Sequence, residues 1–197
     1  ISSRTKTKDS LDCSLNDLPK NFDFFLPLAG IEKTAYKNEN PADIKAASKM
    51  AKIYDEILKD NEFQSEEQLH QLNIFLSRLL FCFFAEDTGI FDKAIFTNSV
   101  SSHTAADGSD LNSYLNRLFQ SLNKQDKSQY PNYLQKFPYV NGGLFAKNYD
   151  SPKFSKQSRD LIIECGQLDW SEINPDIFGS MIQAVVHPSM RGGLGMH

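Results

Sequence analysis

A run of apolar residues in the middle of the chain reads Phe75-Leu76-Ser77-Arg78-Leu79-Leu80-Phe81-Cys82-Phe83-Phe84-Ala85 and is followed by Glu86-Asp87-Thr88-Gly89. Apolar side chains recur here at spacings of three and four, which is typical of an α-helix. Additional phenylalanines widen the apolar stripe, so we expect a central helix with neighbours on several sides. Ser65 and Gln68 form a capping box at its predicted start, and Gly89 is its expected C-terminal cap.

Four further helices are predicted from the same periodicity. The first starts at Asn40-Pro41, because asparagine is a good N-cap and proline suits the first helical position. The other three are expected to begin at Asp110, Ser155 and Asn174-Pro175.

Polar segments separate these helices. Residues 97–109 are rich in Ser, Thr, Asn and Asp and are expected to form a loop, and residues 123–132 form a polar link. Asn141-Gly142 accepts positive φ, which leaves room for one small hairpin near residues 137–145. Period-two alternation is nearly absent and valine is scarce, so the sequence predicts a mainly α fold. We expect a single irregular helical domain of about five or more helices.

The ends of the chain differ in composition from its middle. Residues 1–14 are polar and mixed in charge, and we expect an arm or the end of an upstream region there. Residues 15–190 are expected to form the helical domain, and the glycine-rich residues 191–197 to lead into a further domain. The chain begins at Ile1 rather than methionine, so we interpret it as a piece of a longer protein.

Composition excludes several classes of protein. The chain has 197 residues, a net charge of -4 and 40% hydrophobic residues, a balance that argues against global disorder and against a generally basic coat protein. Three widely spaced cysteines exclude a disulfide framework and fit a reducing, cytoplasmic compartment. The longest apolar run, about 12 residues, is shorter than the roughly 20 needed to cross a bilayer, so we expect no membrane partner.

Three short motifs resemble parts of active sites, and each has a structural explanation. Asp87-Thr88-Gly89 matches the aspartic-protease triplet, but it occurs once and follows a helix. Asn174-Pro175-Asp176-Ile177 departs from the Asn-Pro-Pro-Tyr of amino-methylating enzymes at two positions, and a capped helix start explains it. Gln125-Asp126-Lys127 is a loose form of a nuclease core and is better interpreted as a solvated loop. The histidines show no metal-ligand spacing. We therefore expect no catalytic, cofactor-binding or metal-binding residue in the chain.

One basic stretch could contact a phosphate backbone, and a plain solvated surface is the alternative. Its aromatic neighbours are Tyr149 and Phe154, and Asp150 and Asp160 dilute its charge. The candidate DNA-backbone contacts are Lys147, Lys153, Lys156 and Arg159.

Several segments, taken in this order, resemble the helical spacer region of the MmeI-like restriction–modification enzymes. The first is the apolar run from Phe75 through Gly89 to Phe91. The second is Phe137-Pro138-Tyr139-Val140-Asn141-Gly142-Gly143-Leu144-Phe145, and the third runs from Leu168-Asp169-Trp170 to Ser180. Leu18-Pro19-Lys20-Asn21-Phe22 and Asn40-Pro41-Ala42-Asp43-Ile44-Lys45-Ala46-Ala47 add to the resemblance, which covers residues 15–197.

The resemblance implies a role within a larger enzyme. In that family one polypeptide carries an N-terminal nuclease, a helical spacer, an adenine-specific methyltransferase that uses S-adenosylmethionine, and a target-recognition domain. The family's catalytic Asn-Pro-Pro-Tyr, cofactor glycines and nuclease carboxylates have no matching positions here, so no catalytic residue is carried over. The resemblance thus implies a connector that positions nuclease and methyltransferase modules and contacts both. DNA is the implied partner of the parent enzyme, with S-adenosylmethionine and, for a nuclease, magnesium as cofactors.

Two other functions remain open at this point. A stand-alone helical protein-interaction module would bind a helical partner and show no salt-dependent DNA binding. An enzyme in its own right would depend on Asp87 or another carboxylate. The recognition sequence, the presence of a nuclease in the parent and the oligomeric state are not encoded in these residues.

Overall fold

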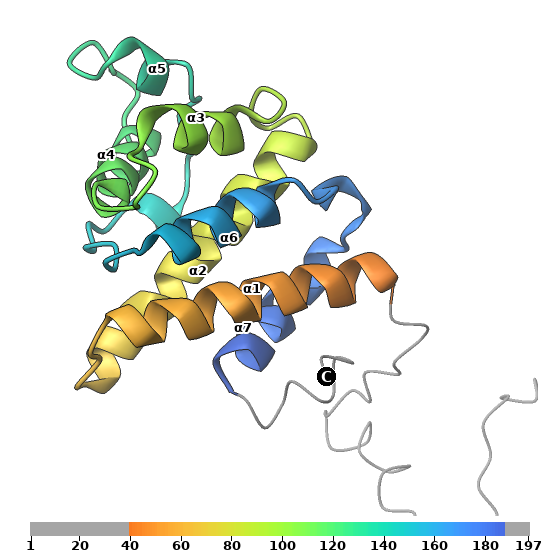
Figure 1. Ribbon diagram of the computed structural model, residues 1–197. Coiled ribbons are helices and arrows are strands. Elements are labelled where there is room, and N and C mark those ends of the chain that lie inside the picture. Colours follow the sequence, from red (N-terminus) through yellow and green to blue (C-terminus); the bar gives the residue numbers. More distant parts are fainter. Residues whose placement is uncertain (1–39, 188–197) are drawn as a thin grey trace, which may run out of the picture. The chain divides into compact units, whose positions relative to one another are not determined.

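The computed structural model describes residues 40–187, which form helices joined by loops (Figure 1). The α-helices and the short 3-10 helices, marked η, are α1 (Pro41–Asp60), α2 (Glu66–Asp87), α3 (Ile95–His103), α4 (Leu111–Leu122), α5 (Asn132–Gln135), η2 (Gly143–Phe145), α6 (Lys156–Gly166), η3 (Trp170–Glu172), η4 (Pro175–Ile177) and α7 (Phe178–Val186). No strand occurs between residues 40 and 187, and the mainly α prediction is confirmed. The expected arm at 1–14, the domain limits at 15 and 190, and the lead-in at 191–197 lie outside the described residues.

The two longest helices begin where the sequence predicts. The Asn40 side chain accepts a hydrogen bond from the amide of Ala42, and Pro41 is the first residue of α1. At the start of α2 the Ser65 hydroxyl accepts from the Gln68 amide, and the Gln68 side chain accepts from the Ser65 amide, so the predicted capping box is present.

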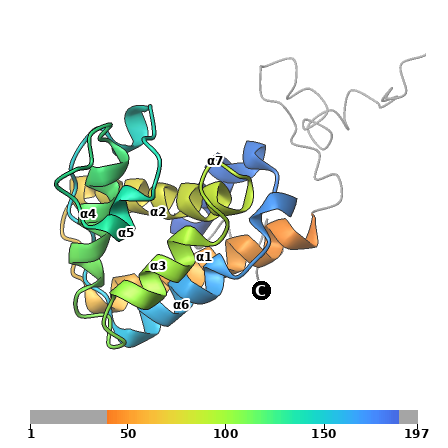
Figure 2. The ribbon, with the colours of Figure 1, turned by 90° about the horizontal axis from the view of Figure 1, so that it is seen from above.

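α2 is the central helix of the domain. Its consecutive residues Arg78, Leu79 and Leu80 are all buried, which a one-sided amphipathic helix does not allow. α2 contacts α3, α7, η2 and η3, and it runs between α4 and α7 in the view from above (Figure 2). α1 packs against α6 and α7, and α6 lies alongside α1 in Figure 1. The prediction of a surrounded central helix is confirmed.

Aromatic rings fill the space around α2. Phe81 contacts Phe91 and Phe145, with ring centroids 5.8 and 5.5 Å apart. On another side of the helix, Phe83 stacks on the buried Trp170 with centroids 5.2 Å apart. Such pairs contribute about 0.5–1.5 kcal/mol each beyond the area they bury.

The expected loop at residues 97–109 is wrong in its first half, because α3 extends to His103. Two of its polar residues, Thr97 and Ser99, are buried with partners from other helices. The amide and hydroxyl of Thr97 donate to the Glu86 carboxylate, and Ser99 accepts from the Tyr114 hydroxyl. A sequence window does not contain these distant partners, so polar composition alone indicated a loop.

Two predicted helix starts differ in detail. α4 begins after Asp110 as expected, but the Asp110 side chain does not cap it and instead accepts a hydrogen bond from the Ala105 amide at 2.8 Å. Asn174 does cap, through the amide of Asp176, but the turn that it starts is the 3-10 helix η4, and α7 begins only at Phe178.

The small hairpin near residues 137–145 is absent. The amide of Val140 donates to the carbonyl of Leu122, and Gly142 has a φ of 165°, which is ordinary extended backbone. The chain then enters η2 rather than a second strand. The Val140 amide is hydrogen-bonded to α4 and therefore does not form the strand pairing that a hairpin needs.

None of the helices within residues 40–187 has the length and apolar character needed to span a lipid bilayer.

Candidate nucleic-acid interface

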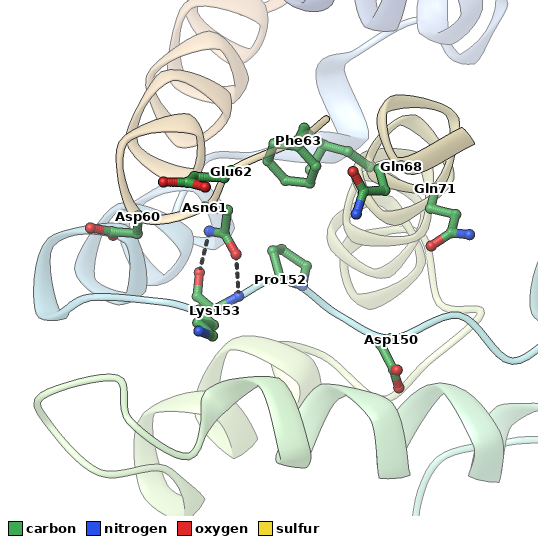
Figure 3. A pocket seen from close by; sticks show the side chains of 10 residues that line it. Asp60, Asn61, Glu62, Phe63, Gln68, Gln71, Asp150, Pro152 and Lys153 are labelled. Atoms are coloured by element: carbon green, nitrogen blue, oxygen red, sulfur yellow. Dashed lines mark hydrogen bonds between the residues drawn. The ribbon is translucent and has the colours of Figure 1, made fainter. Parts of the chain in front are cut away.

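Side chains from three helical regions hold the segment between η2 and α6, residues 146–155, which contains two of the predicted contacts. Arg78 of α2 donates to the carbonyl of Lys147 at 2.6 Å, and Asn116 of α4 accepts from the amide of Ser151 at 2.8 Å. Asn61, at the end of α1, accepts from the amide of Lys153 at 2.8 Å and donates to its carbonyl at 2.9 Å (Figure 3). The 146–155 segment is therefore fixed although it has no regular secondary structure.

Arg78 is the buried anchor of this arrangement. Its Nε donates to the carbonyl of Leu144 at 2.9 Å, and its guanidinium lies 5.4–5.6 Å from the ring centroids of Phe119, Phe145 and Tyr149. No carboxylate forms an ion pair with it among residues 40–187. Burial lowers the pKa of Arg78, while carbonyl oxygens and aromatic faces stabilise its charge.

The four predicted DNA-backbone contacts differ in their exposure and in their ion pairs. Lys147 and Lys153 are exposed and form no ion pair within the described residues. Lys156 is exposed but pairs with Asp160 one turn along α6.

Arg159 is buried, with 7% of its surface exposed. Its Nε donates to the Thr104 hydroxyl at 2.8 Å and its Nη2 to the Ser101 carbonyl at 3.0 Å. Arg159 therefore binds the C-terminal end of α3, where the helix presents carbonyl oxygens. Phe154 is also buried, with its ring 5.7 Å from that of Phe75, so it offers no free face to a base.

The cleft beside Lys153 is lined by more acidic than basic side chains, which disfavours phosphate binding. This cleft, about 490 Å³ in volume, lies between the end of α1, the first turns of α2 and the 146–155 segment (Figure 3). Three carboxylates line it, from Asp60, Glu62 and Asp150, against the single cation of Lys153. The negative balance disfavours an anionic ligand in the cleft itself.

Residues of the motifs considered as catalytic candidates form hydrogen bonds with the main chain. The Asp87 carboxylate accepts from the Trp170 amide at 2.8 Å, which ties the end of α2 to η3. Lys127 was expected in a solvated loop, and this was wrong: it is buried and donates to the carbonyls of Phe137 and Pro138. No group of three or more His, Cys, Asp or Glu side chains that could hold a metal ion occurs in the described part of the chain.

Sequence reasoning missed the residues that hold the 146–155 segment. Arg78 was visible as a lone charge inside an apolar run, a signal that predicts a buried and bonded cation. Asn61 and Asn116 carried no such signal, because an asparagine at a helix end or on a helix surface is ordinary. Only their partners, which lie 92 and 35 residues away in the chain, reveal their role.

The fold and these contacts define an all-helical domain built around one central helix. Comparison with known families specifies it further. The family model described as "MmeI, N-terminal domain" matches residues 3–60, and the one described as "MmeI, helicase spacer domain" matches residues 70–145.

Two individual proteins are similar over most of the chain. "DNA methyltransferase A" of Bacillus subtilis (strain 168) is 53% identical over 194 residues, which are 98% of this chain and 22% of that protein. The solved structure of the type IIL restriction-modification enzyme MmeI in complex with DNA matches with a TM-score of 0.66 and 38% identity. That match covers 81% of this chain and 21% of MmeI.

The chain carries an MmeI-like helical spacer domain. It spans about a fifth of the length of the relatives that it matches. The sequence-based resemblance is confirmed, and the stand-alone interaction module is not favoured.

The two family matches meet inside one packed structure. The N-terminal match ends at residue 60, which is the last residue of α1, and the spacer match runs from α2 to the end of η2. α1 nevertheless packs against α6 and α7, which follow the spacer match. The boundary between the two matches is therefore not a boundary in the fold.

Proposed function

We propose that the chain is the connector segment of a cytoplasmic DNA methyltransferase that is fused to a nuclease module as a type II restriction–modification enzyme. The whole enzyme would methylate adenine with S-adenosylmethionine and, where it cleaves, use magnesium. The observation that carries this proposal is the succession of an N-terminal-domain match and a spacer match along one chain. The connector would set the distance and orientation between the two modules and contact both.

The packing of α1 supports a rigid connection. Lys49 of α1 pairs with Glu164 of α6, and these two charges lie 115 positions apart in the chain. The Asn40 side chain donates to the Glu172 carbonyl at 2.8 Å, and Asp43 accepts from the Asn174 amide. The helix on which the N-terminal match ends is thus held at its first turn and near its middle by the C-terminal part of the domain.

The limits of the connector are part of the proposal. We place its compact body between residue 39 and the end of α7, within the wider span of 15–190. Residues 1–14 would then belong to the upstream region, and residues 191–197 would lead towards the methyltransferase.

The connector would also contact the DNA that the parent enzyme binds. Lys147 and Lys153 are exposed on the fixed 146–155 segment and are available for phosphates. Lys156 is partly neutralised by Asp160, and Arg159 would act only by fixing the end of α3.

The test uses the intact polypeptide that contains this chain. Purified enzyme should bind S-adenosylmethionine and transfer a labelled methyl group from it to adenine in duplex DNA. A polypeptide that binds no S-adenosylmethionine and labels no DNA would overturn the proposal. An insertion of a flexible Gly-Ser linker just before Asn40 should leave methylation intact but blur any fixed cleavage distance, because the coupling through α1 is lost.

A further inference from the structure

Positive charge is concentrated in one part of the chain. Residues 111–149 hold five Lys or Arg residues and one acidic residue, Asp126, although the whole chain has a net charge of -4. One of the five, Lys127, is buried against main-chain carbonyls. The other four are exposed, and none forms an ion pair among residues 40–187: Arg117, Lys124, Lys136 and Lys147.

These cations share one surface, which we call the α4 surface. Arg117 lies on the exposed stripe of α4 with Ser113 and Gln120, and Lys124 is exposed two residues beyond the end of the helix. In the chain that follows α5, η2 packs against this helix. The ends of this stretch are tied to α4 by the bond from the Val140 amide to Leu122 and by the bond from the Ser151 amide to Asn116.

Lys147 lies in the chain between these two tie points and is exposed. Lys136 follows α5, which also packs against α4. Three acidic residues also lie on or next to this surface: Asp110, which accepts from the amide of Ala105, Asp126, which accepts from the amide of Ser128, and Asp150, which is 3.5 Å from the Asn116 amide nitrogen. The four cations outnumber these three carboxylates, so the surface keeps a small positive excess.

No neighbouring atom requires a glycine at position 142 or 143. A Cβ built on either residue meets no atom within 4 Å, and neither residue lies in the left-handed region of φ. By contrast, a Cβ on Gly166 would lie 1.9 Å from the Thr97 hydroxyl oxygen. The amides of Asn141, Gly142 and Gly143 donate no hydrogen bond within the described residues. An exposed backbone without side chains is suited to close approach by a phosphate.

We propose that the α4 surface contacts the phosphate backbone of duplex DNA, through its four exposed cations and the amides around Gly142 and Gly143. This inference rests on the proposed function and moves the main DNA contact from the 146–155 segment towards α4, with Lys147 common to both. Neutral polar residues lie between the cations, and Tyr139 is the exposed large apolar side chain in this part of the chain. A protein partner would require a more apolar centre, so DNA is favoured.

The test measures duplex binding by the full 197-residue chain. Fluorescence anisotropy with a labelled duplex of about 30 base pairs, between about 50 and 200 mM salt, gives the slope of log affinity against log salt. The triple variant Arg117→Gln, Lys124→Gln, Lys147→Gln should reduce this slope by about 3. The matched control Lys45→Gln, Lys52→Gln, Lys93→Gln removes the same charge from exposed residues elsewhere and should leave the slope within about 1 of wild type.

A second measurement tests the main-chain contact. Gly142→Ala with Gly143→Ala should keep the helical circular dichroism spectrum, because both Cβ positions are open, yet should weaken duplex binding. In a nitrogen–proton NMR titration with the same duplex, the amides of residues 141–143 and the exposed stripe of α4 should shift first.

Three results would overturn the inference. They are an absence of salt-dependent duplex binding by the chain, equal losses in the test and control triples, and NMR shifts confined to other surfaces. Each leaves a protein partner as the better interpretation of the α4 surface. None of them bears on methyl transfer by the intact polypeptide, so the proposed function stands or fails separately.

Discussion

Arg78 donates a hydrogen bond of 2.6 Å from Nη2 to the main-chain carbonyl of Lys147, which lies 69 positions later in the chain. The contact joins the central helix to a segment without regular structure. It places a buried cation beneath an exposed one, with a main-chain carbonyl between them. The hydrogen bond from the buried Arg78 therefore fixes the main chain at the exposed Lys147.

Replacing Arg78 by lysine should lower the free energy of unfolding by about 2 kcal/mol, because an ammonium group cannot reach both the Leu144 and Lys147 carbonyls in the planar geometry of the guanidinium. Urea unfolding followed by circular dichroism measures this. Arg117→Lys, on the exposed side of α4, should change it by less than about 0.5 kcal/mol. Equal effects of the two changes would contradict the anchoring role of Arg78.

Gly166→Ala should destabilise the fold by about 1–3 kcal/mol. The new methyl would lie 1.9 Å from the Thr97 hydroxyl oxygen and 3.2 Å from the Phe83 ring, both in the packed core. Gly179→Ala is the matched control, since its methyl meets nothing within 4 Å and alanine is the better helix former. Thermal unfolding should show a lower Tm for the first variant and an unchanged or higher Tm for the second.

Glu86 should make stability depend on pH. Burial raises its pKa, against the hydrogen bonds from Thr97, which lower it. The folded state therefore keeps this proton to a higher pH than the unfolded state, whose value is near 4.5. The contribution of Glu86 to the free energy of unfolding is complete below the pKa of the unfolded state. It is lost as the pH rises through the raised pKa of the folded state.

Glu86→Gln removes that titration. The free energy of unfolding of the variant, relative to wild type, should rise through this pH window and stay constant above it. Urea unfolding between about pH 4 and pH 8 measures the difference. Glu62→Gln, at an exposed position, is the charge-matched control. Parallel curves for Glu86→Gln and wild type would show that Glu86 does not titrate in this range.

Asp87→Asn tests whether the Asp-Thr-Gly triplet takes part in catalysis. The carboxylate accepts from the Trp170 amide, and an asparagine oxygen can still do so, which predicts a loss of about 1 kcal/mol or less. Methyl transfer by the intact polypeptide should be unchanged. Complete loss of activity with normal unfolding would instead make Asp87 a catalytic residue.

Local signals predicted the helices that start with a side-chain cap. Ser65 with Gln68 and Asn40 with Pro41 determine their helix starts through contacts within four residues, so the sequence contains all the partners. The apolar run around Leu79 and Leu80 likewise predicted a helix covered on several sides, since no one-sided surface accommodates it.

Distant polar contacts account for the errors. Thr97 and Ser99 resemble loop residues until Glu86 and Tyr114 are placed beside them. Arg159 belongs to a basic stretch in the sequence, yet its charge is used on the carbonyls at the end of α3. A charge pattern does not distinguish a cation that faces solvent from one that binds the main chain of another helix. For the same reason the predicted interface included Arg159, which is buried against the end of α3.

The position of α1 matters to anyone who exchanges modules between enzymes of this family. A hybrid joined between residues 60 and 70, where the two family matches part, would take α1 from one parent and α6 and α7 from the other. The buried side chains of Met50, Ile53 and Ile57 would then have to fit a foreign partner surface. A junction placed ahead of Asn40 would take α1, α6 and α7 from the same parent and so keep this hydrophobic core intact.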